Sequence, residues 1–165
     1  MKYYFIIGSI FIVLVFGSLF LFTKRTVEVE TIHFNMNETE EAFKVLEFDI
    51  KQPTYLPNNM KLREVTIGMV DGKQQMIGLR YGNKDDTHEF EFSATLSGES
   101  LKDIASKDEY WQWTEVEIGG IQGLVGINDS SKDRSIVLRI DGTLYRFYSK
   151  EMETRQLLKI AKSLK

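Results

Sequence analysis

Residues 64–81 read EVTIGMVDGKQQMIGLRY, and this stretch decides the fold class of the chain. On both sides of Asp71-Gly72 an apolar residue occupies every second position, at Val65, Ile67 and Met69 and again at Ile77, Leu79 and Tyr81. Alternation with a period of two is the pattern of a half-buried strand. Asp-Gly suits a type I′ turn, because both central positions of that turn need positive φ. The stretch therefore predicts an antiparallel hairpin.

Further alternating runs follow this hairpin toward the C-terminus. A third strand is predicted where Phe90, Phe92, Ala94 and Leu96 share one face, and residues 100–106 predict a short helix with Leu101, Ile104 and Ala105 inward. Alternation then resumes over residues 113–118, 121–127, 135–140 and 143–148, with the turns Gly119-Gly120 and Asp141-Gly142 between them. Alternating runs joined by tight turns indicate an antiparallel sheet.

Helical patterns flank the predicted strands. Asn37 can cap a helix that ends near Phe48, and Ser149 can cap a last helix with Leu157, Ile160, Ala161 and Leu164 on one side. Between them, Pro53 and Pro57 bound a rigid, non-helical segment that we expect to lay Tyr55 and Leu56 into the domain. Residues 37–165 thus predict one α+β domain, with a mostly antiparallel, curved sheet of about six or seven strands and two or three helices, one C-terminal.

The N-terminus has a different character. From Tyr3 to Thr23 the chain carries no charge, and Lys2 and the pair Lys24-Arg25 bracket this run. A helix of this length reaches ~31 Å, close to the hydrocarbon thickness of a bilayer. A cleaved secretory signal needs small residues near its end, where this chain has the bulky run LFLF at 19–22. Residues 1–25 therefore predict an uncleaved, single-pass membrane anchor, and residues 26–36 a juxtamembrane connector.

Charge bears on where the domain lies and on what it binds. The basic residues on the two sides of the span are about balanced, so the positive-inside rule does not orient it. Because two residues precede the span, we expect the domain that follows to be the working part and to lie outside the cytoplasm. All 24 acidic residues lie beyond Arg25, whereas three of the 21 basic residues lie at or before it, which leaves the rest a net charge of −6. This balance argues against a nucleic-acid partner.

Four short motifs occur in a fixed order along the predicted domain. They are PTYLP at 53–57, VEIGG at 116–120, GTLY at 142–145 and LLKIAKSL at 157–164. Together they resemble a bacterial domain of unknown function, the DUF4367-type domain, over roughly residues 38–165. The resemblance implies antiparallel strands, a closing helix and attachment by one transmembrane helix, and it carries over no catalytic residue. A more distant likeness is to periplasmic sigma-regulator and lipoprotein-carrier domains, whose curved sheets hold acyl chains or peptide.

Two clusters are candidate sites. Tyr110, Trp111 and Trp113 can stack on a sugar or line a lipid cleft, although large aromatic residues more often belong to a core. Asp85, Asp86, His88, Glu89 and Glu91 include the residue types that bind divalent cations, but their spacing fits a solvated hairpin better than a ligand pattern. We therefore predict Tyr110, Trp111 and Trp113 as a ligand or partner surface, with no catalytic residue, metal or cofactor.

Three functions are compatible with this pattern. The leading hypothesis is a non-enzymatic, membrane-anchored domain that binds a protein or cell-envelope component outside the cytoplasm. The second is a carrier or sensor of an apolar ligand, in a cavity lined by Phe90, Phe92, Trp111, Trp113, Tyr145 and Phe147. The third is a cell-envelope hydrolase that uses His88, although no Gly-x-Ser-x-Gly, His-Glu-x-x-His or phosphate-loop motif occurs.

Overall fold

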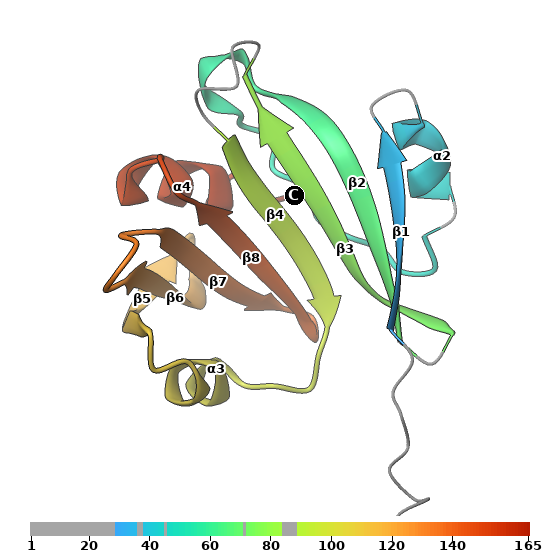
Figure 1. Cartoon of the computed structure of the whole chain (residues 1–165). Helices are drawn as coiled ribbons and strands as arrows, with labels where there is room; N and C mark the ends of the chain where they lie inside the picture. The colour runs from blue at the N-terminus through green and yellow to red at the C-terminus, as the bar shows by residue number, and fades with distance from the viewer. Residues whose placement is uncertain (1–28, 36–37, 45, 71, 84–88) are drawn as a thin grey trace, which may run out of the picture.

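The structure is a computed structural model that describes residues 29–35, 38–44, 46–70, 72–83 and 89–165 (Figure 1). The strands are β1 (Val29–Asn35), β2 (Lys61–Val70), β3 (Lys73–Gly82), β4 (Glu89–Leu96), β5 (Trp111–Ile118), β6 (Ile121–Asn128), β7 (Arg134–Ile140) and β8 (Thr143–Ser149). The helices are α2 (Thr39–Lys44), α3 (Leu101–Lys107) and α4 (Thr154–Ala161), with a 3₁₀ turn η1 (Pro57–Asn59).

All eight described strands form one antiparallel sheet in the order β1-β2-β3-β4-β8-β7-β6-β5. The first four strands and the last four each form one half, and the halves join where β4 pairs with β8. The chain reaches the far edge of the sheet through α3 and returns strand by strand to β8. The predicted antiparallel sheet is confirmed, with eight strands instead of six or seven.

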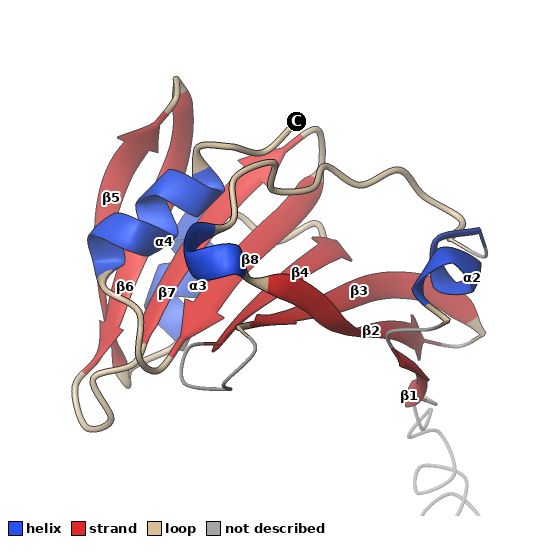
Figure 2. Ribbon diagram, turned by 90° about the horizontal axis from the view of Figure 1, so that it is seen from above, coloured by secondary structure: helices blue, strands red, loops and turns tan. Residues whose placement is uncertain are grey.

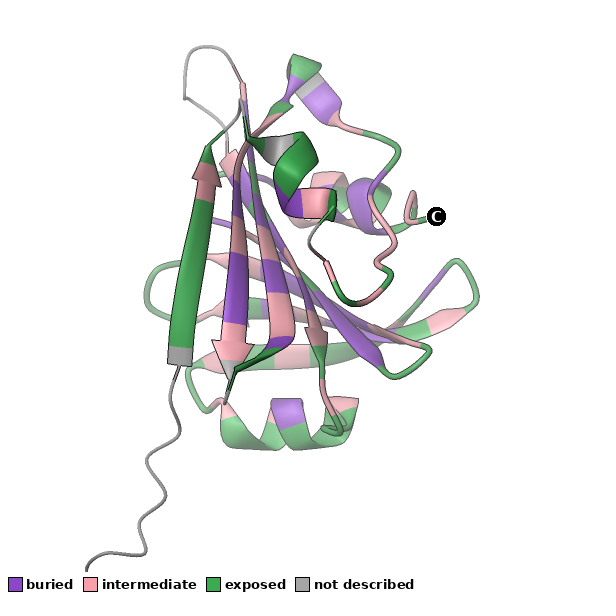
Figure 3. Ribbon diagram, turned by 90° about the vertical axis from the view of Figure 1, so that its right-hand side faces the viewer, coloured by how far each residue is buried: buried purple, intermediate pink, exposed green. Residues whose placement is uncertain are grey.

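The additional strand is β1, which lies within the predicted connector. It pairs with β2 along its whole length, from Val29↔Val70 to Asn35↔Glu64. Figure 3 shows β1 mostly exposed beside strands that carry buried stretches. The segment does alternate apolar and polar residues, as in Ile32-His33-Phe34-Asn35, but the run is short, and its pairing with β2 follows only from the folded sheet.

The two faces of the sheet have different roles. On the core face, Phe92 and Phe147 are fully buried and belong to one cluster with Leu157 and Ile160 of α4. Figure 2 shows α4 beside β7 and β8, within the curve of the sheet. We call the opposite side of the sheet the open face. It carries the strand residues that alternate in sequence with those of the core face.

Helix α3 covers one end of the open face. Its Ile104 packs with three buried residues, Leu124, Val137 and Leu144, in a second cluster that Trp113 borders. The predicted helix at 100–106 is confirmed within one residue at each end. Apolar contacts therefore close this end of the open face. In Figure 1, α3 lies below the strands.

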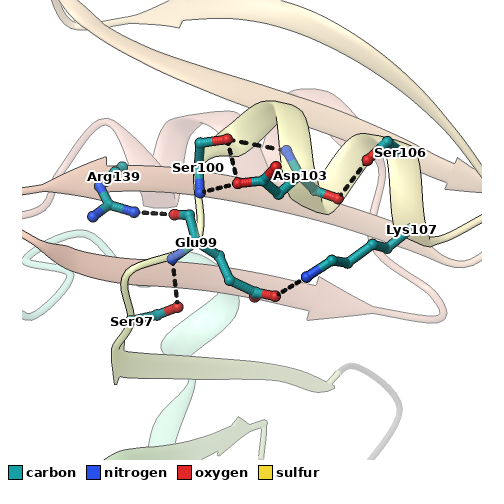
Figure 4. Close-up of polar contacts among 7 residues, drawn as sticks. All are labelled: Ser97, Glu99, Ser100, Asp103, Ser106, Lys107 and Arg139. Carbon is teal, nitrogen blue, oxygen red and sulfur yellow. Dashed lines mark hydrogen bonds and ion pairs between the residues drawn. The ribbon is translucent and has the colours of Figure 1, made fainter.

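Polar contacts hold α3 in this place (Figure 4). The Ser100 hydroxyl accepts a hydrogen bond from the Asp103 backbone N–H at 3.1 Å, and the Asp103 carboxylate accepts one from the Ser100 backbone N–H at 2.9 Å. Hydrogen bonds from the Ser100 hydroxyl and backbone lower the pKa of Asp103. Arg139 on β7 donates to the carbonyl oxygen of Glu99, and Lys107 pairs with the Glu99 carboxylate at 2.7 Å. The helix is thus capped and tied to the sheet.

Both flanking helices differ from the predicted bounds. Helix α2 ends at Lys44, not near Phe48, because the backbone N–H of Glu47 donates to Gln74 Oε1 on β3 at 2.9 Å instead of extending the helix. Helix α4 begins at Thr154, capped by Glu153 rather than by Ser149. The Ser149 hydroxyl donates to the carbonyl oxygen of Glu89 at 2.6 Å, so it belongs to the end of β8. The predicted cap at Asn37 lies outside the described residues.

The proline segment forms a strap that pairs with the C-terminus. Pro53 is buried and bridges to Leu164, and the Tyr55 backbone N–H donates to the Ser163 hydroxyl at 3.0 Å. Leu56 packs against the core as predicted, but Tyr55 is 44% exposed, so its predicted burial is wrong. Pro57 starts the short 3₁₀ turn η1, which corrects the expectation of a wholly non-helical segment. Thr54 and Tyr55 are exposed where both bond to Ser163, and the chain returns to the core at Leu56 and Pro57.

Replacing Gly142 with Val should destabilise the domain by ~1 kcal/mol or more, because a β-branched residue resists positive φ. Asp141 and Gly142 have φ of 49° and 84°, and a Cβ added at Gly142 would meet no atom within 4 Å. The expected loss is therefore backbone strain without a clash. Urea denaturation measures it, and Gly142→Asn is the control, because Asn tolerates this conformation. Equal midpoints for the wild type and Gly142→Val would contradict the turn assignment.

Tyr81 should make the domain sensitive to alkali. Its ring stacks on Phe90 with centroids 4.8 Å apart, and burial raises the pKa of Tyr81 from 10.0 to about 12. The folded state therefore favours the neutral phenol, and the stability from this group is complete below pH 10 and lost as the pH rises toward about 12. Tyr81→Phe should flatten the fall in urea midpoint over this range, whereas Tyr110→Phe at an exposed position should not. A slope that Tyr81→Phe leaves unchanged would show that another group dominates.

Candidate functional site

A cleft of about 600 Å³ crosses the open face of the sheet. We call it the open-face cleft. The residues that border it come from both halves of the sheet and are polar, aromatic and apolar: His33, Glu64, Thr66, Met76, Gly78, Leu79, Arg80, Glu91, Phe92, Ser93, Trp111, Ser135, Arg146 and Tyr148. Its position across the β4–β8 junction means that neither half of the sheet forms it alone.

One wall of the cleft is aromatic and rigid. The rings of Trp111 and Trp113 stack with centroids 5.4 Å apart and an interplanar angle of 21°. Tyr148 meets Trp111 edge-on at 6.3 Å, and its hydroxyl donates to Asp133 Oδ2 at 2.6 Å. Burial, and then this hydrogen bond, raise the pKa of Tyr148, so its phenol stays neutral at physiological pH. Each ring is thus held in one orientation by a neighbour.

The two tryptophans fit because Gly126 faces them. A Cβ at Gly126 would lie 2.5 Å from the Trp113 ring and 3.0 Å from the Trp111 ring. Gly126 pairs directly with Trp113 across β5 and β6. The absence of a side chain at Gly126 therefore leaves room for both indole rings to pack against the sheet.

The opposite wall carries a polar network of three side chains. Glu64 Oε1 lies 2.9 Å from His33 Nδ1, and Glu64 Oε2 lies 2.9 Å from Arg80 Nη2. All three are partly or largely exposed, so the stabilisation from this network is modest. The network holds the Glu64 carboxylate and the Arg80 guanidinium at the rim of the cleft.

Between the walls the floor is made of small side chains. Strand pairing sets Thr66 opposite Gly78 and Gly78 opposite Ser93, while Ser135 lies opposite Tyr148. Thr66, Gly78 and Ser93 lie side by side on β2, β3 and β4, and these small residues leave a depression between the two walls. The register of the sheet therefore creates the cleft.

Three polar groups of the cleft have no partner among the described residues. The Ser135 hydroxyl is fully buried and makes no hydrogen bond, and neither the Glu91 nor the Arg146 side chain makes a hydrogen bond or ion pair in the part of the chain that the structure describes. The indole N–H of Trp113 behind the wall is likewise buried without a partner there. The two buried groups each cost about 1–3 kcal/mol, whereas the exposed Glu91 and Arg146 side chains are hydrated and available to a ligand.

The structure separates the three predicted aromatic residues. Trp111 borders the cleft, and Trp113 supports it from behind and packs on the α3 cluster. Tyr110 precedes β5, is 68% exposed and does not border the cleft. The alternation of β5 turns Trp111 and Trp113 to one face, whereas Tyr110 lies outside the strand.

The cavity expected for an apolar ligand is not formed by the six aromatic residues that were assigned to it. Phe90, Phe92, Tyr145 and Phe147 are buried in the main core, and Trp111 and Trp113 lie on the open face. Phe92 and Trp111 both border the open-face cleft, but Phe92 has no exposed surface. The side chains of the two groups point to opposite faces of one sheet, so the six rings do not enclose a common cavity.

Most of the predicted acidic cluster, including the residue expected for a hydrolase, falls outside the described residues. Asp85, Asp86 and His88 lie outside the described residues. Of the rest, Glu91 borders the cleft, which periodicity alone did not indicate. Tyr148, Ser135 and Arg146 were also missed, because an isolated polar residue within an alternating strand carries no signal of its own.

The predicted anchor at residues 3–23 also lies outside the described residues. Among the helices of the described ranges, none is long and apolar enough to cross a membrane.

Comparison with known proteins places the domain in a family. No curated protein and no solved structure matches the chain significantly. A family model described as a domain of unknown function, DUF4367, matches residues 50–164. This range contains β2 to β8, α3, α4 and the proline strap, and so most of the open-face cleft. The chain therefore belongs to the DUF4367 family of domains of unknown function.

Proposed function

We propose that this protein is a non-enzymatic binding domain, held at a membrane by residues 3–23 and lying outside the cytoplasm, and that the open-face cleft receives its ligand. The observation that carries the proposal is the pair of exposed side chains Glu91 and Arg146, which make no hydrogen bond or ion pair with the described residues and lie in the cleft beside an aromatic wall. Concave sites that combine aromatic surface with a few convergent polar groups are typical binding sites. The uncharged run at residues 3–23 supports the anchor.

The test is site-specific photocrosslinking in intact cells. A photoreactive residue in place of Ser93, on the cleft floor, should give a covalent adduct, and the same residue in place of Lys102, on the exposed side of α3, should not. The full chain should sediment with membranes, and protease added to spheroplasts should digest the domain. Equal labelling from both positions would contradict the site, and a protected domain or full-length protein in the aqueous fraction would contradict the location.

A further inference from the structure

We infer that the ligand of the open-face cleft is a carbohydrate chain that lies across the strands, with one sugar ring stacked on Trp111. The inference rests on the proposed function in one respect, namely that the cleft is the binding site. It adds the chemical class of the ligand.

The aromatic wall suits a sugar ring. Trp113 covers one side of Trp111, and the edge-on contact with Tyr148 fixes the ring, so Trp111 offers the cleft a flat and preorganised surface. The C–H face of a pyranose is apolar and flat, and it packs on such a surface. Little conformational entropy is lost on binding, because the aromatic rings are already fixed.

The unpartnered polar groups suit hydroxyl groups. The Glu91 carboxylate accepts hydrogen bonds and the Arg146 guanidinium donates them, and both side chains are exposed where they border the cleft. Sugar hydroxyls both donate and accept, so different hydroxyls of one chain can bond both side chains. A purely anionic ligand would face the Glu91 carboxylate, and a purely cationic one would face the Arg146 guanidinium.

The shape of the cleft favours a chain. Glu64, Arg80, Glu91, Tyr148 and Ser135 stand opposite one another in a single row from β2 to β7. Four strand spacings separate the ends of this row, which is roughly 19 Å along the sheet. An extended peptide would instead be expected to add to an exposed sheet edge, where backbone groups are free to pair. In the cleft the ligand meets side chains on a sheet face.

Intrinsic fluorescence tests this inference, because the two tryptophans of the chain are Trp111 and Trp113. The purified full chain, in a detergent without a sugar headgroup, is titrated with short oligomers of N-acetylglucosamine and of glucose. We expect a saturable change in tryptophan emission with at least one series. Calorimetry of the same titration should show at least about tenfold weaker binding for Trp111→Ala. Glu91→Gln and Arg146→Gln should also weaken binding.

The matched control is Tyr110→Ala, which removes the neighbouring exposed aromatic ring and should leave the affinity unchanged. Urea midpoints of all variants show whether each has folded. The inference is overturned if neither series binds, if folded Trp111→Ala binds as the wild type does, or if a neutral extended peptide saturates the site where the sugars do not. Crosslinking from Ser93 together with no sugar binding would retain the proposed function and reject the carbohydrate.

Discussion

Phe92→Ala is expected to lower the free energy of unfolding by about 3–5 kcal/mol, the usual cost of removing a buried phenylalanine ring. Phe92 is fully buried and contacts the rings of Phe147 and Tyr145 at centroid distances of 5.1 and 6.0 Å. It also stands opposite Phe147 where β4 pairs with β8. The substitution would leave a cavity at the junction of the two halves of the sheet.

Urea denaturation followed by circular dichroism measures this loss. Domains of this size are stable by about 5–15 kcal/mol, so the variant should unfold at a much lower midpoint. Leu96→Ala on the same strand is the matched control, because Leu96 is 40% exposed and should cost far less. If the two variants unfolded at similar midpoints, β4 would not form the centre of the core.

Gly126→Ala is expected to cost about 1–3 kcal/mol, the usual range for overpacking, and to displace the aromatic wall of the cleft. The new Cβ would lie 2.5 Å from the Trp113 ring, which cannot withdraw because it borders the α3 cluster. The Trp111 ring, 3.0 Å from the same point, would have to move as well. Tryptophan emission and the unfolding midpoint should therefore both change.

A double variant separates this clash from other effects. In a Trp113→Ala background the ring is absent, so adding Gly126→Ala should cost less than it does in the wild type. Gly98→Ala is the control, because a Cβ at Gly98 would meet nothing within 4 Å. Additive losses in the double variant would show that the glycine is needed for another reason.

Much of the fold follows from local signals. The hairpin turns at Gly119-Gly120 and Asp141-Gly142 have the positive φ angles that their residue types indicate. The strands after them begin and end within one or two residues of the alternating runs. The partner of the short alternating run at β1 and the ends of α2 and α4 could not be predicted in this way, because long-range contacts such as the β1–β2 pairing and Glu47 to Gln74 decide them.

The candidate site was predicted less completely. Trp111 and Trp113 stood out by residue type, and the structure stacks them. Tyr148 lies on β8 and Ser135 on β7, whereas Arg80 and Glu91 lie on β3 and β4, in the other half of the sheet. No local sequence pattern links the two pairs. Which aromatic residues face the cleft and which face the core also depended on this pairing.

The sequence by itself determined where strands and tight turns lie, because alternation and positive φ act over a few neighbouring residues. It also determined the family to which the domain belongs. Only the tertiary structure decided that β4 pairs with β8, and with it the row of side chains from Glu64 to Ser135. Pairing between distant strands depends on how the whole core packs, so the cleft exists only in the folded sheet.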